Sequence, residues 1–206
     1  NTKLEELYFE SDDPQNVEGT GEDIKQQLVE DGKAFIVELL KEGNTDEGFD
    51  AGFDLLGNVG FYMAACRRHE ITEPSRETKS PLVEAPALSM QLGASLGEVP
   101  RFASAHLETH NKAINGVYKT FTSLQDEAIF INYNTRAALS YIRASEALLR
   151  TLPLGVSHPI TADLLKAAIT ALQDVVSSND ELFEKLDVSR CIYGVRPYYK
   201  TDRMRL

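Results

Sequence analysis

Apolar residues recur at intervals of three and four along most of the chain, which is the spacing of amphipathic α-helices. Thr20 and Asp23 are suited to cap the first of these helices, and Gly43-Asn44 ends it. No run alternates between apolar and polar residues as a β-strand does, so the predicted fold class is all-α, a helical bundle. The later predicted helices cover about 46–69, about 82–96, about 126–151 and the segment that begins at Pro159.

The same patterns predict how the helices pack. Gly52, Gly57 and Gly60 lack side chains, so another helix can approach this face closely. Four small residues of the helix from 126 allow close packing or leave room for a flat ligand: Ala137, Ala138, Ala144 and Ala147. The last long helix is expected to carry one apolar face, made of Leu165, Ala168, Ile169, Leu172, Val175, Val176, Leu182 and Phe183.

Changes in composition predict three regions. Residues 1–19 are polar and acidic, which indicates an extended arm. Residues 20–100 are expected to form a small amino-terminal helical region, with a proline-containing connector over 70–81. Residues 101–206 hold two long helices and the carboxyl-terminal segment, and are expected to form a second region.

The net charge of −11 comes entirely from the amino-terminal quarter of the chain. Residues 1–50 hold 15 acidic and 4 basic side chains, and the other residues hold 17 of each. Without a basic stripe, and with an acidic front, the chain is not suited to bind nucleic acid. The acidic front is most simply a solubilising surface, with a docking surface for a basic partner as the alternative.

Cysteine usage and hydropathy indicate a cytoplasmic protein. Cys66 and Cys191 are far apart in sequence and belong to no CxxC motif, which predicts buried free thiols in a reducing compartment. The chain has no run of 18 apolar residues, and its first residues lack the pattern of a signal peptide. No membrane partner is expected.

The histidines offer a weak metal pattern. His106 and His110 share a face if their segment is helical, but Glu108 follows the first histidine by two positions instead of one, and no third ligand is evident. A metal-dependent enzyme that uses this pair stays an alternative, and we assign no metal ligands in this chain. His69 lies at a predicted helix end where a cationic side chain is favoured, and His158 is expected to be a cap or surface residue.

The helix from 126 carries polar residues where a purely structural helix would carry aliphatic ones. Asn132, Tyr133 and Arg136 follow Phe130 and Ile131. Buried polar groups cost about 1–3 kcal/mol each unless they are hydrogen-bonded. The pattern therefore predicts either a wet cavity with a hydrogen-bond network or a face open to solvent.

The most distinctive motif lies near the carboxyl end, in Ile192-Tyr193-Gly194-Val195-Arg196-Pro197-Tyr198-Tyr199. A guanidinium between aromatic walls can bind a planar carboxylate with two parallel hydrogen bonds. The motif therefore suggests that Arg196 faces an enclosed pocket for an amino acid. The alternative is a surface turn, with Arg196 solvated and the tyrosines covering the core.

The order of these features resembles the PrnB-like haem proteins of pyrrolnitrin biosynthesis and their relatives in the indoleamine/tryptophan 2,3-dioxygenase superfamily. The resemblance covers about 140 residues and is strongest at the carboxyl end. It rests on Gly60-Phe61-Tyr62, Arg68-His69, His106 to Asn111 with Tyr118, Asp126-Glu127 at the start of the first of two long helices, and Val195-Arg196-Pro197-Tyr198-Tyr199.

The resemblance implies a function. Arg196 would bind the substrate carboxylate on the distal side of a haem, and Phe130, Tyr133 and Tyr199 would line the pocket. The chain would act oxidatively, as an oxygenase- or dioxygenase-like enzyme, on an amino acid such as tryptophan or a derivative, with the chemistry supplied by the haem. Catalytic residues are not assigned.

Two departures from the family pattern matter. Cys191 and Ile192 stand where the dioxygenases have aromatic residues. None of the four histidines matches the proximal haem ligand, which lies beyond the carboxyl-terminal motif in the family. A further polypeptide segment or subunit is therefore expected to complete the haem pocket, unless the chain is a short relative without that ligand. A haem-free binding or interaction module of the same fold is the second hypothesis.

Overall fold

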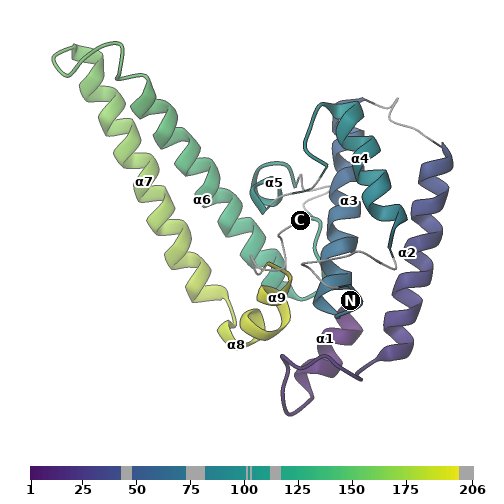
Figure 1. Ribbon diagram of the computed structural model, residues 1–206. Helices are drawn as coiled ribbons and strands as arrows, with labels where there is room; N and C mark the ends of the chain where they lie inside the picture. Colours follow the sequence, from purple (N-terminus) through teal and green to yellow (C-terminus); the bar gives the residue numbers. More distant parts are fainter. Residues whose placement is uncertain (43–47, 73–81, 101, 103, 112–116, 200–206) are drawn as a thin grey trace. The chain divides into compact units, whose positions relative to one another are not determined.

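The computed structural model describes residues 1–42, 48–72, 82–100, 102, 104–111 and 117–199. These residues form helices and no β-strand, which confirms the all-α prediction (Figure 1). Most of the connector predicted over 70–81 and the basic tail beyond residue 199 lie outside them. The helices are α1 (Thr2–Phe9), α2 (Glu22–Glu42), α3 (Phe49–Arg68), α4 (Glu84–Leu96), α5 (Ser104–Thr109), α6 (Gln125–Leu149), α7 (Pro159–Lys185), α8 (Val188–Arg190), the π-helix η1 (Cys191–Val195) and α9 (Arg196–Tyr199).

The chain divides into two compact units. The first comprises Asn1–Ser104, Thr120–Leu124 and Ser189–Leu206, and the second comprises Ala105–Lys119 and Gln125–Val188. This division differs from the predicted boundary at residue 100, because the carboxyl-terminal segment returns to pack in the first unit. Each unit is described by itself below.

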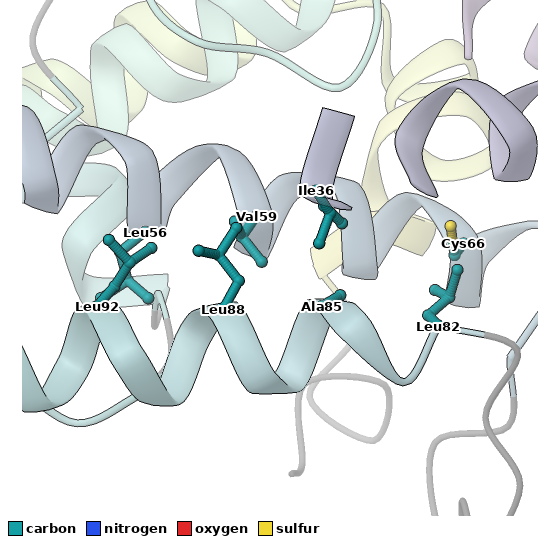
Figure 2. Close-up of a cluster of buried hydrophobic side chains, with 8 residues drawn as sticks. All are labelled: Ile36, Leu56, Val59, Cys66, Leu82, Ala85, Leu88 and Leu92. Atoms are coloured by element: carbon teal, nitrogen blue, oxygen red, sulfur yellow. The ribbon is translucent and has the colours of Figure 1, made fainter. Parts of the chain in front are cut away.

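The first unit has its main core between α2, α3 and α4, close to the three helices predicted there. Gly97 adopts the left-handed conformation (φ 69°) and ends α4 after Leu96, where the predicted helix also ends. Figure 2 shows side chains of α3 and α4 facing one another, with Ile36 reaching in from α2. The buried cluster consists of Ile36, Leu56, Val59, Cys66, Leu82, Ala85, Leu88 and Leu92.

The prediction of an extended arm over residues 1–19 is wrong for its first half. Residues 2–9 form helix α1, and Leu4 and Tyr8 are buried one turn apart together with Val17. The segment therefore has an apolar stripe of its own, and burial of that stripe stabilises a helix too short to form alone. The acidic residues that suggested an arm lie mostly on the outer face, and one of them, Glu5, is buried.

The glycines of α3 permit close packing, as predicted. A Cβ atom on Gly60 would lie 2.7 Å from the Cβ atom of Phe102, and one on Gly52 would lie 2.9 Å from a methyl group of Leu96 in α4. Phe102 packs in turn against Phe53 and Phe61, with ring centroids 5.7 Å and 6.1 Å apart. Gly60 thus provides the space in which the Phe102 backbone and ring rest on α3.

We expect Gly60→Ala to lower the free energy of unfolding by about 1–3 kcal/mol, because the new methyl group overlaps Phe102. This loss should exceed the gain of about 1 kcal/mol in helix propensity. Gly57→Ala is the matched control, since its Cβ atom would lie 3.2 Å or more from the Phe102 ring. Chemical denaturation should find Gly57→Ala close to wild type or more stable. Equal effects of the two substitutions would contradict this role of Gly60.

The second unit is built on a helical hairpin of α6 and α7, which run alongside each other (Figure 1). Ala144 and Ala147 of α6 are buried with Ala168 and Ala171 of α7. Of the two interpretations of the small residues, close helix packing is therefore the one that the structure supports here. His158 caps α7 by accepting a hydrogen bond from the Ile160 amide, 3.3 Å from Nδ1.

The predicted apolar face of α7 is only partly correct. Ala168, Val175 and Leu182 are buried, whereas their larger neighbours in the predicted face are exposed: Leu165, Ile169, Leu172, Val176 and Phe183. The contact with α6 uses a narrow stripe of small residues three and four positions apart, so the bulkier residues beside that stripe remain outside it. The hairpin therefore has a second apolar stripe, which the described residues do not cover. Within the described ranges, no helix has the length and apolar character needed to cross a membrane.

Candidate functional site

The carboxyl-terminal motif forms a π-helix followed by a short α-helix. Cys191, Gly194 and Val195 of η1 are buried, and so are Pro197 and Tyr198 of α9. Single π-helical turns are uncommon and occur frequently at functional sites, where they redirect a side chain. Here the turn comes immediately before the arginine that the sequence singles out.

Arg196 itself is exposed, at the junction of η1 and α9. Its side chain makes no hydrogen bond or ion pair with the other described residues, although buried residues flank it on both sides. This placement matches the alternative in which Arg196 is solvated and the tyrosines cover the core. The structure does not test whether the guanidinium binds a ligand, so its role stays a prediction.

The tyrosines after Arg196 belong to an aromatic cluster in the first unit. The Tyr198 ring stacks on Phe121 with centroids 4.5 Å apart and planes at 15°, and the Tyr199 ring meets Phe121 edge-on at 5.3 Å. Phe121 also contacts Phe61 of α3 at 4.5 Å. Both tyrosines therefore find packing partners within this unit.

A buried ion pair lies beneath this segment. The Arg68 guanidinium donates two parallel hydrogen bonds to the Glu5 carboxylate, with Nε 2.9 Å from Oε1 and one terminal nitrogen 3.0 Å from Oε2. The side chains are 1% and 2% exposed, so the pair is shielded from water. The Arg68 guanidinium also lies 4.9 Å from the centre of the Tyr8 ring. Burial raises the pKa of the Glu5 carboxyl, whereas hydrogen bonds from Arg68 oppose that shift.

A chain of hydrogen bonds continues from this pair through His69. The Tyr8 hydroxyl lies 3.0 Å from Nδ1 of His69, and Nε2 lies 3.1 Å from Oδ1 of Asn1. The Asn1 amide nitrogen donates to the Phe121 carbonyl at 2.8 Å, which orients its oxygen toward the imidazole. The ring therefore carries its proton on Nε2 and accepts from Tyr8. Burial, followed by the charge of Arg68, lowers the pKa of His69 to about 3. The expectation of a cationic His69 is thus wrong, because this histidine is buried and not at a solvated helix end.

The depressed pKa of His69 predicts a stability that depends on pH. The unfolded chain binds a proton at this histidine below about pH 6.5, whereas the folded protein does not until its pKa near 3 is reached. Stability contributed by neutral His69 is therefore complete above about pH 6.5 and is lost as the pH falls, at up to about 1.4 kcal/mol per pH unit.

We expect the free energy of unfolding to fall by about 2 kcal/mol from this source between pH 7 and pH 5. His69→Gln has no titrating ring, so the difference in stability between it and wild type should shrink over the same range. Urea denaturation at several pH values provides the comparison. A difference that does not change with pH would show that His69 does not carry this dependence.

A small pocket lies beside η1 within the first unit. Its volume is about 170 Å³, and its walls include Phe9 and Leu124, the Arg190 side chain and Gly194 of the π-helix. Glu5 contributes to its wall as well. Arg196 does not line this pocket. A second, apolar pocket of about 370 Å³ lies between α2 and α3, with Tyr62 among its walls, and contains none of the predicted site residues.

Phe130 and Tyr133 lie on α6, in the second unit. Phe130 is half-buried, and Tyr133 is buried with its hydroxyl donating to Glu181 at 3.1 Å and accepting from Lys185. The cations of Arg136 and Lys185 each lie 5.0 Å from the centre of the Tyr133 ring. The polar pattern on α6 thus forms a hydrogen-bond network with α7. The structure brings Arg196 and Tyr199 together on α9, while Phe130 and Tyr133 belong to the other unit.

Metal and haem chemistry both depend on the histidines. Within the described residues, no three histidine, cysteine or acidic side chains gather as metal ligands. His106 and His110 contact each other edge-on, with ring centroids 5.7 Å apart. A haem site needs an axial ligand facing an apolar cleft. His69 uses both ring nitrogens in hydrogen bonds within the core, so it has no nitrogen left to serve as an axial ligand.

Sequence reasoning missed Glu5, Tyr8 and the neutral state of His69. The first two fall in the segment that was expected to be an arm. Leu4, Leu7 and Tyr8 do have helical spacing, so a search for short amphipathic helices provides a signal for α1. The pairing of Glu5 with Arg68, 63 residues away, has no such signal.

Comparison with known protein families gives one match over nearly the whole chain. The family described as Monodechloroaminopyrrolnitrin synthase PrnB matches residues 1–205. A search of curated proteins gives no match.

Proposed function

Because this chain belongs to the PrnB family, we propose that it forms part of an oxidative enzyme that acts on tryptophan or a related or derived amino acid. The single observation that carries the proposal is the family match over residues 1–205, which includes the carboxyl-terminal motif. The family name denotes a synthase of an aminated aromatic product, so a substrate with an aromatic ring and an amine is consistent with it. The reaction itself, whether ring cleavage, rearrangement or amine oxidation, is not specified by these residues.

We assign the substrate carboxylate to Arg196. Its guanidinium is exposed and unpaired among the described residues, while the buried Val195, Pro197 and Tyr198 hold the backbone on either side. A fixed backbone with an available fork of donors suits bidentate binding of a carboxylate. Tyr199, partly buried three residues later, is the proposed aromatic neighbour of the bound amino acid.

Phe130 and Tyr133 of α6 are also proposed to contribute to binding of the amino acid. The two side chains lie three positions apart, which is one turn of the helix, so both project from one side of α6. The Tyr133 hydroxyl is already bonded to Glu181 and Lys185. The cations of Arg136 and Lys185 also lie 5.0 Å from the centre of its ring, so a ligand that reaches Tyr133 would have to displace one of these contacts.

The proposed cofactor is haem, with its axial ligand supplied by a further polypeptide segment or subunit. The exposed apolar stripe of α7 supports a partner that covers it, since exposed stripes of this kind are typical of surfaces that other protein elements cover. Haem would supply the redox chemistry when bound, and the residues of this chain would bind the carboxylate, orient the ring and exclude water.

The visible spectrum and intact mass of the protein, purified with any polypeptide that accompanies it, test this proposal. We expect a Soret band that shifts when tryptophan is added. A preparation that binds tryptophan without a Soret band would overturn the haem assignment and favour the second candidate, a haem-free binding module of the same fold. The buried, fully hydrogen-bonded state of His69 is the observation that keeps this candidate open.

A further inference from the structure

The Glu5–Arg68 ion pair connects elements that are far apart in the sequence. Glu5 lies on α1 and Arg68 on the last turn of α3, and their fork-shaped contact is buried. Breaking one partner of a buried pair is costly, because the remaining charge has no compensation. The pair therefore holds α1 on α3 firmly.

The same guanidinium reaches the π-helix. A terminal nitrogen of Arg68 donates to the backbone carbonyl of Tyr193 at 3.5 Å and to that of Pro14 at 3.4 Å. Tyr193 is the central residue of η1. Tyr198 of α9, two residues after Arg196, is buried in the same unit. The ion pair thus contacts the backbone of the element that immediately precedes Arg196.

The π-helix needs such support. Its hydrogen-bond geometry is less favourable than that of an α-helix, so it persists where surrounding contacts specify it. Gly194 adds a second constraint, because a Cβ atom at this position would lie 3.0 Å from Leu124. The backbone at 193–194 is therefore fixed on one side by Arg68 and lies close to Leu124.

We propose that Arg68, held by Glu5, is a positioning residue for Arg196. By fixing the Tyr193 carbonyl within η1, the ion pair sets the direction in which the backbone leaves the π-helix, and hence where the Arg196 guanidinium points. The role of Arg196 as carboxylate ligand is that of the proposed function, on which this inference rests. Neither Glu5 nor Arg68 touches the substrate in this account.

A purely structural ion pair would make a different prediction. Its loss would lower the stability of the whole first unit without changing η1 in the molecules that remain folded. Positioning instead requires that η1 loosens locally while α3 stays intact. The two cysteines of the chain separate these cases, because Cys191 is the first residue of η1 and Cys66 lies in the core face of α3.

The test uses two proteins with a single thiol each: Cys66→Ala keeps Cys191, and Cys191→Ala keeps Cys66. Each is made in the wild-type background and in the double variant Glu5→Met/Arg68→Met. The double substitution replaces the pair by apolar side chains of similar length, which preserves folding better than removal of one charge. We expect the reaction of Cys191 with DTNB to be faster by about tenfold or more in the double variant, and that of Cys66 to be unchanged. Equal acceleration of both thiols, or of neither, would overturn the proposal. If the double variant does not fold, Arg68→Lys takes its place, since it keeps the positive charge but loses the paired donors of the guanidinium. The DTNB reaction rates of the two thiols are then compared between Arg68→Lys and wild type.

Tryptophan affinity provides the second measurement, made on the protein together with any polypeptide that completes it. We expect about tenfold weaker binding in the double variant, with Arg143→Met, an exposed ion-pair residue of α6, as an unchanged control. Loss of affinity in Arg196→Ala but not in the double variant would refute positioning and leave the proposed function standing. A wild-type protein that binds no amino acid would refute the proposed function, while the thiol reactivities would still decide whether Arg68 holds η1.

Discussion

Arg196→Ala is expected to weaken tryptophan binding about 100-fold, which corresponds to about 2.8 kcal/mol of binding free energy. A loss of this size is typical when charged hydrogen bonds to a carboxylate are removed. The substitution should leave the helical content unchanged, because the side chain is exposed and makes no contact that the fold requires. The chain contains no tryptophan, so the fluorescence of the ligand's indole ring can be excited selectively, at wavelengths where the protein's tyrosines absorb little.

Two further variants make this result specific. Arg196→Lys keeps the positive charge but loses the planar fork, so we expect a loss of affinity between wild type and Arg196→Ala. Arg143→Ala removes an exposed arginine that pairs with Asp174 in the second unit, and should leave affinity unchanged. Similar losses in Arg143→Ala and Arg196→Ala would indicate a general charge effect, and not a carboxylate site.

Arg68→Met is expected to lower the free energy of unfolding by about 3–5 kcal/mol, because it leaves the Glu5 carboxylate buried without its partner. This is a large share of the 5–15 kcal/mol or so that a typical domain possesses. Thermal and urea denaturation, followed by circular dichroism, should show the change clearly.

The double variant provides the matching comparison. Glu5→Met/Arg68→Met removes both charges, so most of the lost stability should return. Arg136→Met is a useful surface control, since its pairing with Glu181 is exposed and contributes little. If the double variant were as unstable as Arg68→Met, the cost would come from lost packing of the long side chain, and not from an uncompensated charge.

The long helices could be predicted from the sequence because each carries a periodic apolar pattern with local signals at its ends. Pro159 begins α7 and Gly97 ends α4, as their positions indicated. The buried face of α7 was harder to predict. Helix pairs that pack through alanines bury a narrow stripe, and hydrophobicity alone favours the larger neighbours such as Ile169 and Phe183.

Helix α1 could not be separated from an arm by composition. It has eight residues, two of them acidic, and its stability comes from burial of Leu4 and Tyr8 and from the Glu5 ion pair. The ion pair joins residues 63 positions apart, so no local pattern encodes it. The neutral state of His69 follows from the same long-range packing.

The candidate site could be predicted only in part. The sequence identified Arg196 and its aromatic neighbours as a distinctive motif, and the structure places Tyr198 and Tyr199 against Phe121. It did not predict the π-helix, which depends on contacts of the backbone at Tyr193 and Gly194 with distant residues. Resemblance added the expected role of Arg196, which neither hydropathy nor spacing can provide.

Affinities for tryptophan and for tryptamine, which lacks the carboxylate, give the most direct test when both are measured on wild type and on Arg196→Ala. If Arg196 binds the carboxylate, wild type should prefer tryptophan by about 100-fold, and the variant should bind the two ligands almost equally. A preference for tryptophan that survives in Arg196→Ala would contradict the account.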